Sequence, residues 1–268
     1  YVRNYALERF YILALFSPIF LLYPVAEIEV LARKEIFIFV LFILHCSIPI
    51  KQIFIYRLSK IIILPICMLI WEPVIFFILF WIFIDLIINK INNNGQKILI
   101  ELLYYFPTFL IALHFIFSPL TEEQHAEMVN YLSQNFGEVC YMSCALLGDK
   151  STLIQQFQGN IPSYSFEVFI RYFLIIIIGF YPLFVLLNNS KFKNKNLFLF
   201  NLFKKQTNLF YASLLPVSIL FAMGFDWGRW VNITYVFFVL IYFHLLKKNY
   251  LILSYKRLKE SLIYKIKG

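Results

Sequence analysis

The stretch that decides the fold runs from Ile61 to Ile88 and reads IIILPICMLIWEPVIFFILFWIFIDLII. It is longer than the roughly 20 apolar residues that one helix needs to cross the hydrocarbon of a bilayer. It predicts either one long tilted helix or two helices that turn at Trp71-Glu72-Pro73. A proline at the first position of a new helix and a carboxylate at its N-terminus both suit a turn at this point.

The rest of the chain has the same apolar character. Of its 268 residues, 61% are hydrophobic and only 15% are charged, and the mean hydropathy is +0.75. A soluble domain has about 45–50% apolar and about 25% charged residues, so this chain has too little polar surface for a water-soluble globule. The apolar runs are continuous rather than alternating, which favours helices over a membrane barrel. The first residue is Tyr1 rather than Met, which leaves open that an N-terminal piece is missing.

Eight apolar runs can form membrane-spanning helices if their ends include flanking residues. They are Phe10–Ala26, Ile36–Ile50, Ile53–Trp71, Pro73–Asn89, Ile98–Phe117, Phe166–Leu187, Leu209–Phe225 and Val231–Leu246. We therefore predict an all-α, polytopic helical membrane protein, with residues 1–268 forming a single integral membrane domain. One long loop, at about residues 118–165, separates the fifth run from the sixth. We detect no internal repeat and no glycine motif of the P-loop or dinucleotide-binding type.

The distribution of Lys and Arg favours eight spans over seven. With eight spans and both termini cytoplasmic, 19 of the 24 Lys and Arg residues lie inside, whereas merging the two helices at Trp71 leaves only eight inside. Cytoplasmic loops carry an excess of Lys and Arg, so eight spans are predicted. The cations left on the non-cytoplasmic face are Arg33, Lys34, Lys150, Arg171 and Arg229.

The segment from Gly224 to Trp230 has the strongest local pattern and reads GFDWGRW. It places an acid, a base, two tryptophans and two glycines between two apolar runs. An interfacial aromatic anchor with an Asp226–Arg229 ion pair closing a tight turn is one interpretation. Ionisable groups at membrane depth are costly and are therefore functional by default, which favours a functional site here.

Arg33 and Lys34 are adjacent cations on the outer face, against the charge rule, so something must offset their charge. A phosphate or pyrophosphate of a lipid-linked ligand would do so, with bidentate contacts from Arg and a point charge from Lys. The alternative is that both side chains reach outer headgroups, paired with Glu27 or Glu29.

Two further charged residues are candidates. Glu72 would act as a general base or position a sugar hydroxyl, or it would only interact with the dipole of the following helix. Arg171 lies about one turn inside the sixth run. It would form an ion pair with Glu167, four residues earlier, or serve as a second phosphate ligand.

The loop at about residues 118–165 is expected to be partly helical and to lie over the site as a lid. Glu123, His125 and Glu127 alternate, which is poor metal-binding geometry on a helix, so neither a metal site nor a cofactor is predicted. The sequence leaves open whether Cys140 and Cys144 are bonded: an oxidising compartment would allow a disulfide, whereas the three residues between them make a strained loop. Three histidines are expected to be packing groups within apolar runs: His45, His114 and His244.

Together these motifs resemble the Wzy-like (O-antigen type) and EpsG-like polysaccharide polymerase families, bacterial membrane proteins of surface-glycan assembly. Three segments carry the resemblance: Leu31-Ala-Arg33-Lys34-Glu35 before a span, Trp71-Glu72 leading into an aromatic-rich span, and Asp226-Trp-Gly-Arg229-Trp230 before the last span. The first is similar to a GRKE pattern with Ala32 in place of Gly. The second is similar to an HE pattern with Trp71 in place of His.

The resemblance implies glycosyl transfer at the outer leaflet of the cell (inner) membrane, joining a polyprenyl-diphosphate-linked oligosaccharide to a second lipid-linked repeat unit. Cations would stabilise charge on the leaving pyrophosphate, and a carboxylate would act as base toward the acceptor hydroxyl. The candidate pyrophosphate ligands are Arg33, Lys34, Arg229 and Arg171, and the candidate catalytic carboxylates are Asp226 and Glu72. The expected partners are the lipid bilayer and other glycan-assembly membrane proteins, and no nucleic acid is expected.

A transporter or flippase for a lipid-linked or anionic solute is the alternative function. Transporters show internal repeats and broken helices near the bilayer centre, whereas here no repeat is found and the candidate charges gather at one face. A non-catalytic scaffold of a glycan-assembly complex is a third option. Convergence of Arg33, Glu72 and Arg229 in one outward-open cavity would favour the enzyme.

Overall fold

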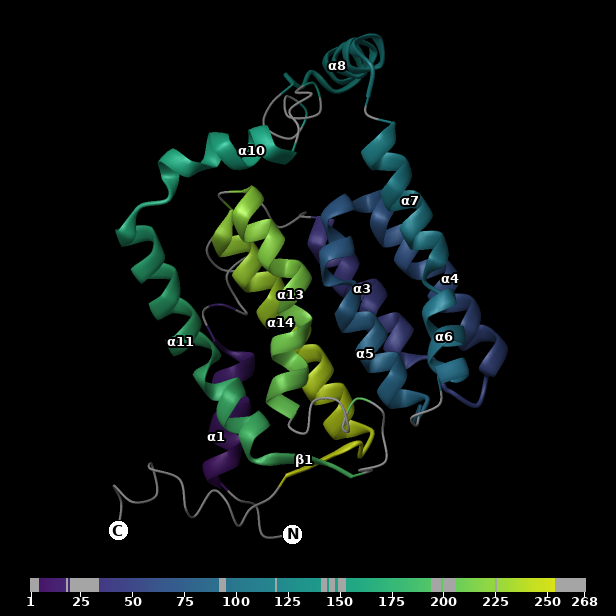
Figure 1. Cartoon of the computed structure of the whole chain (residues 1–268), viewed down its shortest axis with the longest axis vertical. Coiled ribbons are helices and arrows are strands. Elements are labelled where there is room, and N and C mark those ends of the chain that lie inside the picture. Colours follow the sequence, from purple (N-terminus) through teal and green to yellow (C-terminus); the bar gives the residue numbers. More distant parts are fainter. Residues whose placement is uncertain are drawn as a thin grey trace.

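The computed structural model describes residues 5–17, 19, 34–91, 95–118, 120–140, 144, 148, 153–193, 199, 206–224 and 226–253. Within these residues the chain is mostly helical, as predicted, with eleven α-helices (Figure 1). Two short 3-10 helices and two three-residue strands complete the described elements.

The α-helices are α1 (Tyr5–Leu15), α3 (Lys34–Ser47), α4 (Ile53–Ile70), α5 (Ile78–Ile88), α6 (Gly95–Leu103), α7 (Phe106–Phe117), α8 (Glu122–Phe136), α10 (Leu153–Asn160), α11 (Phe166–Asn188), α13 (Gln206–Met223) and α14 (Trp227–Lys247). The 3-10 helices are η2 (Glu72–Phe77) and η3 (Ile161–Ser163), and the strands are β1 (Ser190–Phe192) and β2 (Leu251–Leu253).

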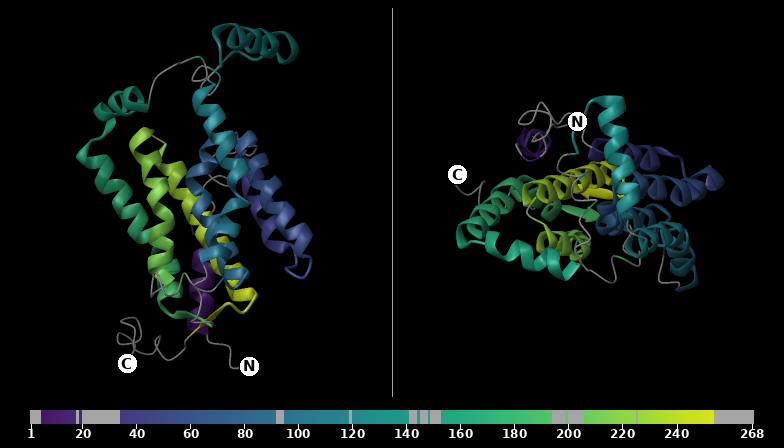
Figure 2. Two further views of the ribbon diagram at one scale, coloured as in Figure 1. Left: turned by 45° about the vertical axis from the view of Figure 1, so that its right-hand side comes forward. Right: turned by 90° about the horizontal axis from the view of Figure 1, so that it is seen from above.

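Helix α14 is the central element of the bundle. It packs against α3, α5, α11 and α13, and Figures 1 and 2 show it between α11 and α13 on one side and the helices from α3 to α7 on the other. In its apolar stretch 72% of the residues are buried, compared with 39% in α4 and 28% in α11. Phe237 of α14 packs against the rings of Phe42, Phe77 and Phe80. On the other side, Phe238 packs against Phe180 of α11 and Phe210 of α13, so aromatic residues of α14 contact the helices on both sides.

The stretch from Ile61 to Ile88 forms two helices rather than one. Helix α4 ends at Ile70, Trp71 is extended, and η2 begins at Glu72 with a proline in its first turn. The Tyr56 hydroxyl, near the start of α4, donates to Asp85, near the end of α5. The two helices therefore run antiparallel, and the predicted turn at Trp71-Glu72-Pro73 is confirmed.

Among the described helices, three are long and apolar enough to cross a membrane, namely α4, α11 and α14. Helices α6 and α7 meet this test only together, and they are bent by 49° at their junction. The 14 residues of α3 rise only about 21 Å, whereas the hydrocarbon of a bilayer is about 30 Å thick. The described helices therefore support a membrane protein without confirming eight spans.

The bundle has two distinct ends, which we call the strand end and the α8 end (Figure 1). At the strand end, β1 and β2 pair antiparallel with Lys191 opposite Ile252. At the other end, α8 and α10 lie beyond the long helices (Figures 1 and 2). The described part of the loop at residues 118–165 is therefore partly helical, as expected.

The end of α10 and the segment after it are hydrogen-bonded to α13. The Tyr164 hydroxyl donates to the Ala222 carbonyl oxygen at 2.6 Å, and the Asn160 amide donates to the Met223 carbonyl oxygen. Burial raises the pKa of the Tyr164 hydroxyl, so this side chain remains a hydrogen-bond donor at neutral pH. These contacts fix the loop beside the start of α14.

Candidate functional site

Three segments far apart in the sequence meet at the α8 end: the start of α3, the break after α4 and the start of α14. Arg229 of α14 forms an ion pair through Nε with Oε1 of Glu35, and its Nη1 lies 3.4 Å from Oδ2 of Asp226. The guanidinium carbon lies 5.3 Å from the ring centroid of Trp71 and 5.5 Å from that of Trp230. We call these five residues the arginine cluster.

Local backbone conformation explains how the cluster forms. Asp226 immediately precedes α14, and Arg229 lies three residues later, one turn along the helix. The extended conformation of Trp71 (φ −158°, ψ 105°) ends α4. The Trp71 and Trp230 rings stack with centroids 6.0 Å apart and an interplanar angle of 27°. A cation over aromatic faces is a favourable arrangement, so the two indoles help to hold the guanidinium.

The charged side chains of the cluster differ in their exposure to solvent. The Glu35 side chain is 1% exposed and that of Arg229 is 23% exposed, whereas the Asp226 side chain is 51% exposed. Removing a carboxylate from water is costly unless it is paired, which explains why Glu35 faces Arg229. Asp226 is the carboxylate of the cluster that a ligand can reach.

Two buried polar atoms of the cluster have no hydrogen-bond partner among the described residues. They are Oε2 of Glu35, an acceptor, and Nε1 of Trp230, a donor. Leaving a buried donor or acceptor unpaired costs about 1–3 kcal/mol, so such atoms are typical of places where a water or ligand group binds.

Among the described residues, neither predicted site residue of the first two motifs belongs to the arginine cluster. Lys34 is the first residue of α3 and is exposed. Glu72 follows Trp71 directly, and its side chain is exposed at the start of η2. Arg33 lies outside the described residues. Glu35 therefore contributes the cluster's contact from the Arg33-Lys34-Glu35 motif, and it was not among the predicted site residues.

Arg171 lies beside the arginine cluster rather than in it. It is exposed on α11, and its guanidinium carbon is 5.4 Å from the ring centroid of Tyr172. That ring contacts Trp227 edge-to-face at 5.4 Å, next to Asp226 in the chain. The contact with Tyr172 thus places Arg171 one ring away from α14.

A second polar group, which the sequence analysis missed, is buried near the strand end among α3, α4, α5 and the junction of α6 and α7. Its centre is Asp85, which is 1% exposed. Oδ1 of Asp85 lies 2.9 Å from Nε2 of His45 and accepts from the Tyr56 hydroxyl. Oδ2 accepts from the Tyr105 hydroxyl and lies 3.2 Å from the Lys60 Nζ.

Two more side chains complete this buried network. Lys60 forms a second ion pair with Glu101, whose side chain is 13% exposed. The Ser59 hydroxyl donates to the Tyr56 carbonyl oxygen at 2.7 Å and lies 2.9 Å from Nδ1 of His45. The buried network therefore consists of His45, Tyr56, Ser59, Lys60, Asp85, Glu101 and Tyr105.

Both ring nitrogens of His45 have a hydrogen-bond partner in the buried network. A serine hydroxyl has one proton, and that of Ser59 is used on the Tyr56 carbonyl oxygen, so its oxygen accepts from Nδ1 of His45. Nε2 lies 2.9 Å from Oδ1 of the Asp85 carboxylate.

The sequence did contain a signal for this network. Asp85 lies within the predicted span Pro73–Asn89, and an ionisable residue inside an apolar run marks a functional or paired site by default. His45, which was expected to be a packing group, lies in this polar network with Ser59 and Asp85 as its hydrogen-bond partners. The expectation that charged residues gather at one face is wrong, because this network lies near the end opposite the arginine cluster.

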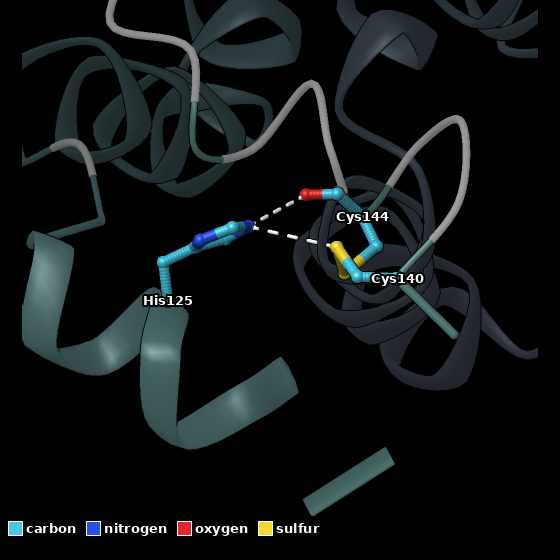
Figure 3. A group of neighbouring side chains, drawn as sticks. All are labelled: His125, Cys140 and Cys144. Atoms are coloured by element: carbon cyan, nitrogen blue, oxygen red, sulfur yellow. Dashed lines mark hydrogen bonds between the residues drawn. A yellow bond between two sulfur atoms is a disulfide. The ribbon is translucent and has the colours of Figure 1, made fainter. Parts of the chain in front are cut away.

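Cys140 and Cys144 form a disulfide at the α8 end, and His125 of α8 lies against it (Figure 3). Nε2 of His125 donates to the Cys144 carbonyl oxygen at 2.8 Å and lies 3.9 Å from the Cys140 sulfur. The ligand atoms of these three residues lie within 4.8 Å of one another. Metal ions bind cysteine as the thiolate, so the disulfide shown here does not offer such a site.

No protein-family model, curated protein or solved structure matches this chain. Function is therefore inferred from the residues of the two polar sites.

Proposed function

We propose that this chain is a glycosyltransferase-type polymerase that joins polyprenyl-diphosphate-linked glycan repeat units at the outer leaflet of the cell membrane. The observation that carries the proposal is the meeting of Glu35, Trp71, Asp226 and Arg229 in one cluster. These residues come from the three motifs that resemble the Wzy-like and EpsG-like families. Catalytic residues from distant segments that meet at one end of a bundle are typical of an active site.

The proposal includes about eight membrane spans with both termini cytoplasmic. Helices shorter than a bilayer would span it together with flanking residues or by thinning the bilayer locally. An exposed apolar face of α3 supports lipid contact, because Phe37, Val40 and Leu44 lie on it at helical spacing and are each more than half exposed. In this arrangement the α8 end faces outward.

Asp226 is the proposed base. Its half-exposed carboxylate would take the proton of the acceptor hydroxyl, whose oxygen then attacks the anomeric carbon of the donor sugar. The bond from that carbon to the diphosphate oxygen breaks, and the lipid diphosphate leaves with the bonding electrons. Arg229 positions Asp226, and the exposed Lys34 beside Glu35 is the proposed cation for the leaving group.

The first test is the variant Asp226→Asn in a strain that makes the surface glycan. Because Asn cannot accept the hydroxyl proton, we expect long-chain glycan to fall by about 100-fold or more, with normal amounts of the protein in the membrane. Single repeat units on the lipid should accumulate. Glu127→Gln is the matched control, since this α8 carboxylate is exposed at the same end. Normal chain length in Asp226→Asn would rule out the assigned base.

A second candidate function, transport of a lipid-linked or anionic solute, is supported by the buried network. Charged side chains within apolar helices mark ion or substrate pathways in transporters. Deletion of the gene separates the two functions, because loss of a flippase leaves its lipid-linked substrate on the inner leaflet. Loss of a polymerase instead leaves single repeat units on the outer leaflet.

A further inference from the structure

A pocket of about 400 Å³ opens at the strand end, between the start of α4, the end of α5 and the start of α6. Tyr56, Lys60 and Glu101 of the buried network form part of its wall. It is remote from the arginine cluster, because Tyr56 and Trp71 are separated by about 22 Å along α4. The pocket therefore belongs to a different site.

The pocket is basic. Three cations line it, Arg57, Lys60 and Lys97, with Glu101 as the carboxylate of the wall. Lys60 and Glu101 form an ion pair, which neutralises their charges within the wall. The lining residues thus include three cations against one carboxylate, and basic pockets between membrane helices recognise anionic lipid headgroups.

Two of the three cations lie over the ring of Tyr104. The guanidinium carbon of Arg57 lies 6.0 Å from the ring centroid of Tyr104, and Nζ of Lys60 lies 5.5 Å from the same centroid. Lys97 is in the first turn of α6, so the positive end of that helix dipole adds to its charge. An anion in this pocket would meet cations from two helices, Arg57 of α4 and Lys97 of α6.

The remaining wall of the pocket is largely apolar. Four isoleucines line it: Ile50, Ile53, Ile91 and Ile100. A small inorganic anion would leave these side chains uncovered, whereas an amphiphile would place its anionic group between the cations and its apolar part along the isoleucines. Arginine is suited to phosphate because its planar guanidinium makes bidentate hydrogen bonds.

We infer that this basic pocket binds the phosphate group of an anionic amphiphile, the headgroup of a phospholipid such as phosphatidylglycerol. The lipid's acyl chains would extend along the exposed apolar faces of α4 and α6. A lipid bound there would contact both α4, which carries Lys60, and α6, which carries Glu101, and would stabilise the ends of these two helices. The inference does not depend on the proposed glycan chemistry at the α8 end.

The experiment is titration of the purified full chain in detergent with phosphatidylglycerol, with bound lipid counted by native mass spectrometry. We expect one phosphatidylglycerol to bind at least about tenfold more tightly than phosphatidylcholine. The double variant Arg57→Gln/Lys97→Gln should lower the affinity for phosphatidylglycerol by about tenfold or more, because the loss of one hydrogen bond from a charged group changes affinity by about that factor. Lys51→Gln is the matched control, because Lys51 is an exposed cation at the same end that does not line the pocket.

Inorganic phosphate is the second probe, because it has the anionic group without the apolar part. It should displace the lipid only at concentrations at least tenfold above that of phosphatidylglycerol.

Arg57 and Lys97 are exposed, so the double variant should keep the thermal unfolding temperature of the wild type, which verifies its fold. Equal lipid affinity of the folded double variant and the wild type would overturn the inference. Displacement by inorganic phosphate at the lipid's own concentration would overturn its amphiphile part.

Discussion

Arg229 and Asp85 are the two residues around which the polar groups of this protein are organised. Arg229 is a cation with two carboxylate partners, Glu35 and Asp226. Asp85 is a carboxylate with four donors around its two oxygens. Their exposure separates their roles, because a ligand can reach the arginine cluster through Asp226, whereas Asp85 is enclosed.

Replacement of Asp85 tests whether the buried network stabilises the fold. We expect Asp85→Asn to lower the free energy of unfolding by about 3–5 kcal/mol, because His45 and Lys60 then lose the buried carboxylate that they share. Thermal unfolding of the purified protein in detergent measures the change. Asp226→Asn is the control, because its side chain is 51% exposed and its ion pair should contribute no more than about 1 kcal/mol. Similar unfolding temperatures for both variants would contradict the role given to Asp85.

At the scale of elements, the break at Trp71 is the most consequential feature. It turns one apolar stretch into the antiparallel pair α4 and α5, which brings Tyr56 beside Asp85 at one end. At the other end it brings Trp71 beside Trp230. Both polar sites therefore depend on the same turn.

The disulfide of the α8 end has a local effect. A loop of about five residues closed by a disulfide constrains the unfolded chain by only about 2 kcal/mol. We expect Cys140→Ser/Cys144→Ser to make the loop at residues 118–165 more sensitive to limited proteolysis, while the unfolding temperature of the helix bundle changes little. Reductant should make the wild type equally sensitive and should not change the variant further. A variant as resistant as the oxidised wild type would show that the disulfide does not order the loop.

The whole molecule has two chemically different ends, which predicts its orientation in the membrane. The α8 end has the disulfide and the half-exposed Asp226, whereas the strand end has the basic pocket. We expect a cysteine introduced by Glu127→Cys to react in intact cells with a thiol reagent that does not cross membranes. A cysteine introduced by Lys51→Cys should react only after the membrane is permeabilised. The reverse pattern would contradict the proposed orientation.

Part of the candidate site was accessible from the sequence. The GFDWGRW segment identified Asp226 and Arg229 because acid, base and aromatic residues are close together in the chain. Glu35 was harder to assign, because its partner Arg229 is 194 residues away. Arg33 and Lys34 were predicted as site residues because of their charge, whereas in the structure it is the neighbouring carboxylate, Glu35, that contacts Arg229.

Local patterns in the sequence alone determined the helical membrane class, the turn at Trp71-Glu72-Pro73 and the polar segments outside the apolar runs. These follow from composition, run length and proline placement, which act over a few turns of chain. Only the tertiary structure decided that Glu35 meets Arg229 and that Asp85 joins His45, Tyr56 and Lys60. Helices in lipid are apolar on nearly every face, so their hydrophobic pattern does not specify which neighbours they pack against.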